Sequence, residues 1–218
     1  MMTIEAQMDP TVMVGSNLPA IGGTLRIGGK GCFVAESCEY TNSFLRFAPT
    51  VSVILNVEED HLDFFKDIND IIHSFHEFAE LTPMNGLVVV NHDDPNAMRA
   101  VAHIDRRIRT FGTTSDADVY PTEVRDENGY YRFTVNIDGK EYAKVALSVP
   151  GRHNMLNALA CCAAAEFLGV PGEAAEKGLN KFTGSSRRFQ LVGKMPNGAT
   201  VVDDYAHHPS EMKATLST

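Results

Sequence analysis

The sequence is short of basic residues and has no cluster of positive charge. Its 218 residues include 19 lysines and arginines against 28 aspartates and glutamates, which gives a formal net charge of −9 at pH 7. Nucleic acids and anionic membrane surfaces bind proteins through clustered positive charge, so this composition argues against both as partners. An anionic ligand would need metal ions or a few local arginines to offset the negative field.

Cysteine pairs with the C-x-x-C spacing and long hydrophobic runs are also missing. The four cysteines, Cys32, Cys38, Cys161 and Cys162, show no C-x-x-C spacing, and we interpret them as reduced, mostly buried thiols of a cytosolic protein. No apolar run reaches about 18 residues, and no signal peptide opens the chain. A cytoplasmic protein without membrane segments is therefore predicted, and the length favours one large domain with part of a second.

The apolar pattern predicts an α/β fold with a mostly parallel sheet and flanking helices. Short runs rich in β-branched residues predict buried strands at 51–57, 87–91 and 109–111. Helices are predicted between them, at 67–81 behind an acidic cap and from 93 onward, where proline takes a first-turn position. Alternation of strands and helices implies parallel strands with helices on both faces of the sheet.

The pattern changes after residue 129, where a small antiparallel hairpin is predicted. Alternating runs at 130–137 and 140–149 flank Asp138-Gly139, a strong hairpin signal because both turn residues must take positive φ. The other expectations are the end of a helix before Asp9-Pro10, a loop at 13–23, a strand at 32–36, helices at 154–168 and 171–179, a strand at 201–202 and a helix from 209.

Side chains that can bind metal ions follow two of the predicted strands. Glu36 ends one strand, Glu39 lies just beyond it, and His61 follows the strand at 51–57 within the acidic stretch 58–63. If the two strands are neighbours, a carboxylate and an imidazole converge at one edge of the sheet. Carboxylates suit Mg²⁺ or Mn²⁺, and Mn²⁺ tolerates imidazole more readily. The alternative is a solvated acidic loop with a helix-capping aspartate.

The helix predicted after residue 150 is a candidate site for a nucleotide. It opens with G-R-H-N-M-L-N, so that Asn154 and Asn157 lie three residues apart on one face. Asparagine amides can recognise the edge of a base, and the free N–H groups of a helix start favour an anion or a polar ring. The alternative is that Asn154 only caps the helix.

Two further stretches carry polar groups that fit a ligand site. Arg187-Arg188 offers guanidinium groups that match phosphate geometry, although such pairs are commonly only solvated. The run D-D-Y-A-H-H-P at 203–209 places two acids and two histidines on a turn from strand to helix. The alternative there is a capping aspartate with unrelated histidines. Gly29-Lys30 is not a phosphate loop, because that motif needs glycine at Thr24 and serine or threonine at Gly31.

These motifs, taken in order, resemble the central ATP-binding domain of the Mur ligases, a family with a fold like that of P-loop NTPases. The motifs are E-x-x-E-Y…S-F-L at 36–45, N-V-E-E-D-H-L-D at 56–63, G-R-H-N-M-L-N-A at 151–158, R-R-F at 187–189 and D-D-Y-A-H-H-P at 203–209. Each motif alone is weakly specific, whereas five in order are highly specific. The resemblance covers nearly the whole chain.

The resemblance implies an ATP-dependent ligase of peptidoglycan precursor synthesis. ATP would phosphorylate the carboxylate of UDP-N-acetylmuramate to an acyl phosphate, and the amine of L-alanine would then attack it, with divalent cations neutralising charge. Y-T-N-S-F-L and D-F-F-K-D are more similar to members that add L-alanine than to the muropeptide (tripeptide) ligases of cell-wall recycling, which are the alternative. A second alternative is a module that binds a nucleotide or metal without catalysis.

The resemblance also assigns roles to individual residues. Glu36 and His61 match the metal ligands, with Glu39 a weaker candidate, and His207 completes the expected catalytic set. The nucleotide side is matched by His153, Asn154, Asn157, Arg188 and Asp204, and the acceptor side by Tyr205 and His207. The helix from 68 to 81 contains no lysine, so the carbamylated lysine of some family members is not expected.

The resemblance divides the chain into a central domain at 1–190 and the start of a carboxyl-terminal domain at 191–218. The glycine-rich phosphate loop of the family, with its lysine and threonine, would lie just before residue 1. We therefore expect this loop, the amino-terminal domain that holds the UDP group and most of the carboxyl-terminal domain to lie outside this chain.

Positioning of the γ-phosphate supplies most of the catalysis of phosphoryl transfer, so we predict that the 218-residue chain alone does not turn over. The measurement is mass spectrometry of a mixture with ATP, Mg²⁺, UDP-N-acetylmuramate and L-alanine. Detection of the alanyl product would refute this prediction.

Overall fold

The computed structural model describes all 218 residues, and its largest element is a six-stranded sheet with the order β4-β5-β6-β7-β8-β9. Strands β4 to β7 are parallel, and β8 and β9 continue the sheet in antiparallel fashion. The strands are β4 (Val51–Ile54), β5 (Leu87–Asn91), β6 (Ile108–Phe111), β7 (Val119–Glu127), β8 (Tyr130–Ile137) and β9 (Lys140–Ala146). The predicted α/β class with a mostly parallel sheet is confirmed.

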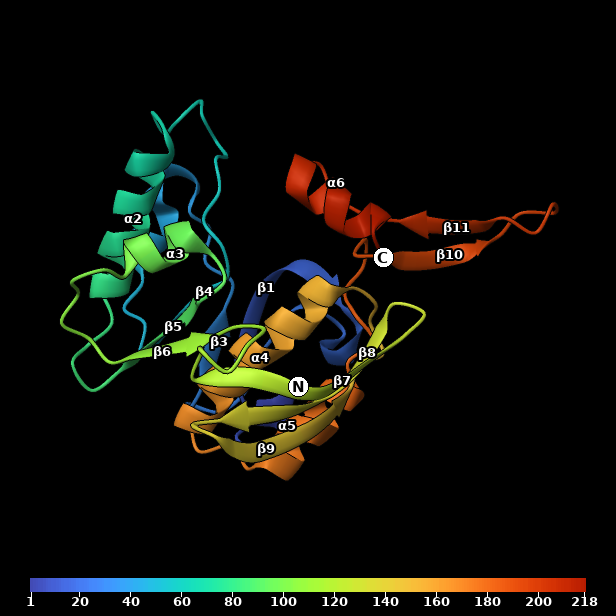
Figure 1. Cartoon of the computed structure of the whole chain (residues 1–218), viewed down its shortest axis with the longest axis horizontal. Helices are drawn as coiled ribbons and strands as arrows, with labels where there is room; N and C mark the ends of the chain where they lie inside the picture. Colours follow the sequence, from blue (N-terminus) through green and yellow to red (C-terminus); the bar gives the residue numbers. More distant parts are fainter.

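Helices cover both faces of this sheet, and β5 shows it most clearly. All five residues of β5 are buried. Leu87 and Val89 belong to the core beneath α4 (Arg152–Phe167), whereas Val88 and Val90 belong to the core beneath α2 (Ile68–Glu80) and α3 (Pro95–Ala100). Figure 1 shows α2 and α3 on one side of the sheet and α4 with α5 (Gly172–Asn180) on the other. The uninterrupted apolar run of β5 follows from this double covering.

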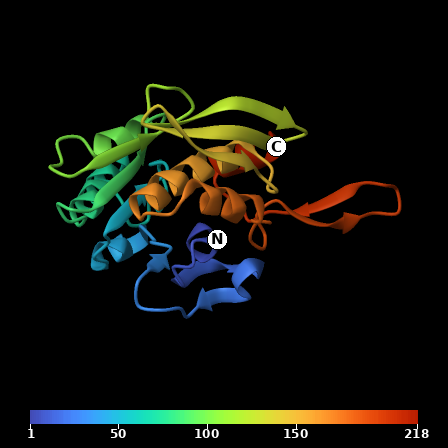
Figure 2. The same cartoon turned by 90° about the horizontal axis from the view of Figure 1, so that it is seen from below.

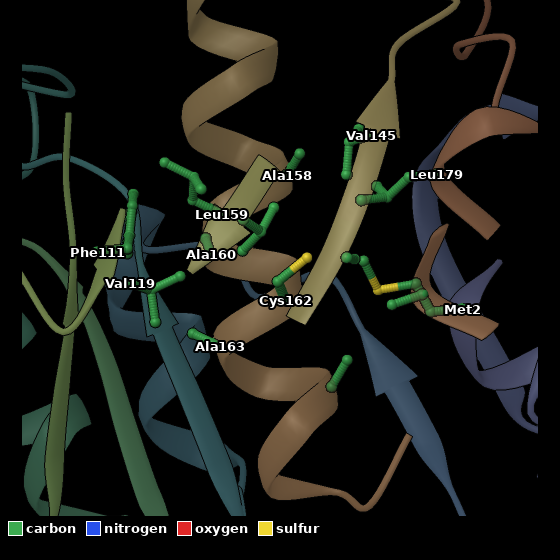
Figure 3. Close-up of a cluster of buried hydrophobic side chains, with 14 of the residues drawn as sticks. Met2, Phe111, Val119, Val145, Ala158, Leu159, Ala160, Cys162, Ala163 and Leu179 are labelled. Carbon is green, nitrogen blue, oxygen red and sulfur yellow. The ribbon is translucent and has the colours of Figure 1, made fainter. Parts of the chain in front are cut away.

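Small side chains let α4 approach the sheet closely. Ala158, Ala160 and Ala163 are buried along the helix, together with the fully buried Leu159. Figure 3 shows α4 running through this cluster, with Phe111 and Val119 on one side and Val145 and Leu179 on the other. Met2, from the short helix α1 (Met2–Glu5), reaches the same cluster. The helix is therefore apolar around most of its circumference because neighbours cover it on more than one side.

Side-chain caps fix where the predicted helices begin. The Asp67 carboxylate accepts the N–H groups of Asn69 and Asp70, at 2.8 and 3.1 Å, and Asp94 accepts that of Ala97 at 2.6 Å. These bonds satisfy donors that a helix start leaves free. Helices α2 and α3 thus begin where the sequence predicts, whereas α4 begins at Arg152, two residues earlier than predicted.

A second, three-stranded sheet precedes the main one. It consists of β1 (Thr11–Leu18), β2 (Gly23–Arg26) and β3 (Phe33–Ala35), in the order β2-β1-β3, with a 3₁₀ turn at Pro19–Ile21. The prediction of a loop at 13–23 is wrong, because glycine and serine interrupt the apolar alternation of β1 without ending the strand. Figure 2 shows this small sheet as a separate layer, on the side of α4 away from the main sheet.

The strand at 33–35 exists as predicted, but it pairs with β1 and not with β4. The expectation that the strands before Glu36 and His61 are neighbours in one sheet is therefore wrong. Strand β4 lies at the edge of the main sheet and is shorter than predicted. Val53 in β4 and Leu55 just after it are 39% and 41% exposed, whereas Val51 packs against the core beneath α4, so one face of β4 is only partly covered.

The antiparallel hairpin is confirmed in position and turn. Asp138 and Gly139 both have positive φ, at 51° and 76°, and its strands join the main sheet through β7. Strand β7 was not predicted, because Pro121 and a run of charged residues hide its alternation. The strand β10 (Gln190–Lys194) was also missed, and it pairs with β11 (Thr200–Asp203).

The last segment forms the β10–β11 hairpin and the helix α6 (Pro209–Leu216). Figures 1 and 2 show the hairpin projecting from the body of the protein. Its apolar side chains have little cover, and Leu191 is 66% exposed. None of the helices of the protein is both long and apolar enough to cross a lipid bilayer.

The close approach of two backbone segments at Gly86, just before β5, gives a stability prediction. A Cβ atom at Gly86 would lie 2.4 Å from the carbonyl oxygen of Thr50. We expect Gly86→Ala to lower the free energy of unfolding by about 1–3 kcal/mol through overpacking. Gly31→Ala is the matched control, because nothing lies within 4 Å of a Cβ there. Equal denaturation midpoints for the two variants would contradict the prediction.

Candidate functional site

Three side chains that can bind a metal ion gather beyond the carboxyl end of β4. One ligand atom each of Glu39, Asp60 and His61 lies within 4.8 Å of the other two. His61 Nε2 is 3.4 Å from Glu39 Oε1, and His61 Nδ1 is 3.8 Å from Asp60 Oδ1. The side chains of Glu39, Asp60 and His61 are 33%, 45% and 31% exposed, so an ion from solvent can reach them. Two carboxylates and an imidazole fit Mg²⁺ or Mn²⁺ as oxygen-rich ligands with one tolerated nitrogen.

Local geometry holds His61 in this group. Its φ is +51°, and its backbone N–H donates to Asp60 Oδ1 over 2.7 Å. The centroid of the Tyr40 ring lies 4.5 Å from that of the His61 ring. The Tyr40 hydroxyl donates to Asp63 over 2.7 Å, and this bond raises the pKa of Tyr40. The phenol therefore stays protonated at neutral pH and supports one face of the imidazole.

Glu36 does not join this group in the structure. Its exposed carboxylate accepts the backbone N–H of Gly15 in the small sheet. Glu39, the weaker candidate of the sequence analysis, stands beside His61 instead. The assignment of Glu36 as a metal ligand remains a prediction from the family resemblance.

The start of α4 presents the two asparagines on one face, as their spacing predicts. Asn154 Nδ2 donates to the carbonyl oxygen of Pro150 over 2.7 Å, and Asn157 Nδ2 donates to Asn154 Oδ1 over 3.4 Å. Asn154 therefore ties the helix to the preceding turn. Asn157 keeps its carbonyl oxygen without a partner in the chain, so this oxygen can accept a hydrogen bond from a ligand.

Asp204, His153 and Arg188 lie near one another beside this helix start. Desolvation lowers the pKa of His153, Asp204 opposes this shift, and Arg188 adds to it. The Asp204 carboxylate accepts the N–H groups of Phe189 and Ala206, at 2.9 and 2.8 Å. It also accepts the hydroxyl of Thr215 at 3.1 Å. Three of its roughly four acceptor positions are thus used within the chain, which leaves one for a ligand hydroxyl.

Tyr205 and His207 are exposed on the turn before α6. Their ring centroids are 5.2 Å apart, and the guanidinium of Arg187 lies 4.8 Å from the centre of the Tyr205 ring. His207 Nδ1 lies 3.1 Å from the carbonyl oxygen of Tyr205. Both side chains can therefore meet a substrate from solvent, and a cation beside the tyrosine face holds that ring in place.

The turn before α6 also connects the two groups of candidate residues. We name residues 58–61 the acid loop. His208 Nε2 lies 2.9 Å from the carbonyl oxygen of Glu59 in this loop. Behind it, Glu211 pairs with Arg188 at 3.4 Å. Burial raises the pKa of Glu211, but backbone N–H groups of His207 and His208 and the charge of Arg188 outweigh it and lower the pKa. Glu211 therefore stays ionised.

A cavity of about 230 Å³ lies between the acid loop and the start of α6. Carboxylates of Glu58, Asp60 and Glu211 line it, and Phe65 lies at its apolar side. The sequence analysis did not single out Asp60, Tyr40, His208 or Glu211. Asp60 could have been found, because it directly precedes His61 in the acidic stretch. Tyr40 and His208 gain their positions only from contacts between segments far apart in the sequence.

Comparison with protein families gives two matches. The family described as Mur ligase middle domain matches residues 27–165, and the one described as Mur ligase, glutamate ligase domain, matches residues 187–218. The curated relatives include the UDP-N-acetylmuramate–L-alanine ligase of Agathobacter rectalis, which is 48% identical over 215 residues. That match covers 98% of this chain and 47% of the relative, so the chain spans about half the length of the curated relatives that it matches.

Solved structures give the same match. The UDP-N-acetylmuramate–alanine ligase of Thermotoga maritima has a TM-score of 0.82 at 28% identity, over 100% of this chain and 49% of that protein. A murein peptide ligase from Psychrobacter arcticus has a TM-score of 0.78 at 25% identity, over 99% of this chain and 50% of that protein.

The cluster beside His61 gives a prediction about metal binding. We expect Mn²⁺ to raise the thermal midpoint of the chain, and His61→Ala to remove most of this increase, because it deletes the central ligand of the group. His73→Ala, an exposed histidine on α2, is the control and should keep the full increase.

Differential scanning fluorimetry with and without Mn²⁺ checks this prediction, and an unchanged increase in His61→Ala would contradict it. Glu36→Gln and Glu39→Gln measured alongside separate the ligand that the sequence predicts from the one that stands beside His61.

Proposed function

This chain belongs to the Mur ligase family, and from that premise we propose that it forms the central part of an enzyme that joins L-alanine to UDP-N-acetylmuramate at the expense of ATP. This reaction is a step of peptidoglycan precursor synthesis, and the enzyme would be cytoplasmic. The curated relatives named for this activity are 41–48% identical to the chain, which favours this activity over that of the peptide ligases. The substrates and partners of the whole protein are part of this proposal.

The observation that carries the proposal is the arrangement of polar groups around the start of α6. Glu39, together with Asp60 and His61 of the acid loop, forms a group that fits a divalent cation, and His208 at the start of α6 contacts this loop. Glu211 of α6 pairs with Arg188, whose charge acts on His153 at the start of α4. Phosphoryl transfer needs a cation between a nucleotide and its acceptor, since charge on the phosphate oxygens must be neutralised. The two ends of this arrangement support both requirements.

Each group then has a role that its contacts allow. Asn157 would accept a hydrogen bond from the amino group of adenine through its free oxygen, with His153 and Asn154 beside it. Arg188 would pair with a phosphate, and Asp204 would accept a ribose hydroxyl at its remaining position. A guanidinium suits phosphate oxygens, whereas a carboxylate with an open acceptor position suits a hydroxyl.

Glu39, with Asp60 and His61 of the acid loop, would hold Mg²⁺ or Mn²⁺, and the sequence resemblance adds Glu36. The ion would neutralise phosphate charge when bound. Tyr205 and His207 stand at the surface facing solvent, where the muramyl carboxylate and the amine of L-alanine would meet. Their roles are orientation of the acceptor and, for His207, hydrogen bonding to the reacting groups.

Two other functions remain as outcomes of the test. A muropeptide ligase of cell-wall recycling would accept a tripeptide in place of L-alanine. A module that binds a nucleotide or metal without chemistry would bind ATP and give no product with any acceptor. The distinguishing observation is which product, if any, forms.

A hybrid enzyme tests the proposal. The matching segment of the Agathobacter rectalis ligase is replaced by this chain, and the hybrid is assayed with ATP, Mg²⁺ and UDP-N-acetylmuramate, with either L-alanine or the tripeptide. We expect the L-alanyl product by mass spectrometry, and Asn157→Ala should raise KM for ATP about tenfold through loss of a hydrogen bond to the base. Exposed Lys194→Ala in β10 is the matched control. A hybrid that folds and binds ATP yet forms only the tripeptide product, or none, would overturn the proposal.

A further inference from the structure

His208 makes a set of contacts that the proposed chemistry does not use. Its Nε2 atom lies 2.9 Å from the carbonyl oxygen of Glu59, and its Nδ1 atom lies 2.7 Å from Ser210 Oγ. The Glu58 carboxylate is 3.6 Å from Nδ1. The side chain is 25% exposed, less than half the value for the neighbouring His207, which is 65% exposed. The ring therefore lies between the acid loop and the first turn of α6.

The partners of the ring determine which nitrogen carries a proton. A backbone carbonyl oxygen can only accept a hydrogen bond, so Nε2 must donate to Glu59. A serine hydroxyl can donate or accept, so Ser210 satisfies Nδ1 whether or not that nitrogen is protonated. The hydrogen bond from Nε2 to Glu59 thus forms whether the ring is neutral or protonated. It requires only that the side chain is long enough to bring Nε2 to the carbonyl oxygen.

These contacts join two parts of the chain that otherwise touch little. Among the hydrogen bonds and ion pairs of the structure, all of those between residues 187–218 and the rest of the chain are made by His208. At the other end of α6, Thr218 lies against Gly151 at the start of α4. The first turn of α6, which follows the turn with Tyr205 and His207, is therefore held against the acid loop by one imidazole.

We propose that His208 is a positioning residue, which latches the first turn of α6 onto the acid loop and so sets the distance between His207 and the ion-binding group at His61. The effect of His208 on catalysis rests on the proposed function, whereas the latch between α6 and the acid loop does not. His208 and Ser210 also line the cavity between the acid loop and α6, together with Asp60.

Two amide variants of the 218-residue chain test the latch. The Nε2 amide of glutamine can reach the position of the histidine Nε2 and donate to Glu59, whereas the asparagine side chain is one methylene too short. His208 is the N-cap of α6, where asparagine is itself a good cap, so the acid loop is the region to compare. We expect His208→Asn to speed hydrogen exchange in the acid loop about three- to tenfold, the effect of one lost hydrogen bond. His208→Gln should stay close to the parent chain.

Amides of β5 report on global unfolding and should be unchanged in both variants. Met212→Ala, an exposed side chain on α6 with no partner in the acid loop, is the control. Equal exchange in the parent chain and His208→Asn, or equal acceleration in the asparagine and glutamine variants, would overturn the latch.

The same two substitutions in the hybrid enzyme test the positioning role. We expect His208→Asn to lower kcat at least threefold with KM for ATP unchanged, because α4 and its asparagines are not displaced, and His208→Gln to restore kcat. If exchange changes in the isolated chain but kcat does not change, the latch stands and its positioning role is overturned. A hybrid without any activity refutes the proposed function and leaves the exchange result as the test of the latch.

Discussion

The covering of β5 on both faces is the constraint on which the rest of the structure depends. Helices can pack on each side because four of its five buried residues are apolar, and the fifth, Asn91, donates its side-chain N–H to the carbonyl oxygen of Leu55. Parallel strands beside it must then end at one edge of the sheet. The loop after β4 consequently carries its acids and His61 to that edge, where open α/β sheets bind their ligands.

Electrostatics then explain how an acidic protein can bind an anionic substrate. The chain has a formal charge of −9, and the acid loop adds to the negative field at the place where phosphates would approach. A cation held by Glu39, Asp60 and His61 would reverse this field locally. The arginines belong to a different part of the chain, residues 187–218. Arg187 lies over the ring of Tyr205, and Arg188 pairs with Glu211. Under the proposed function, two separate segments would supply the positive charge that the composition lacks.

Much of the fold could be predicted from local patterns, and the failures have physical causes. Helices α2 and α3 were found through the caps Asp67 and Asp94, and the hairpin through Asp138-Gly139, because these signals act within a few residues. Strand β1 was missed since Gly15 and Ser16 break its alternation. The pairing of β3 with β1 is decided by tertiary contacts, and a short stretch of sequence does not reveal it. For the same reason the site was only partly predicted: His61 and Glu39 were named, but the company of Asp60 and the support from Tyr40 arise from folding.

The exposed β10–β11 hairpin has a consequence for how this polypeptide loses its structure. A hairpin that buries little apolar area is only weakly stabilised by contacts with the main sheet. Such regions unfold locally at a much lower free energy than the core. Heating should then melt the hairpin and β5 in separate steps, so that a single transition temperature describes the sheet body alone. Probes that report on one region at a time are therefore needed to follow the unfolding of this polypeptide.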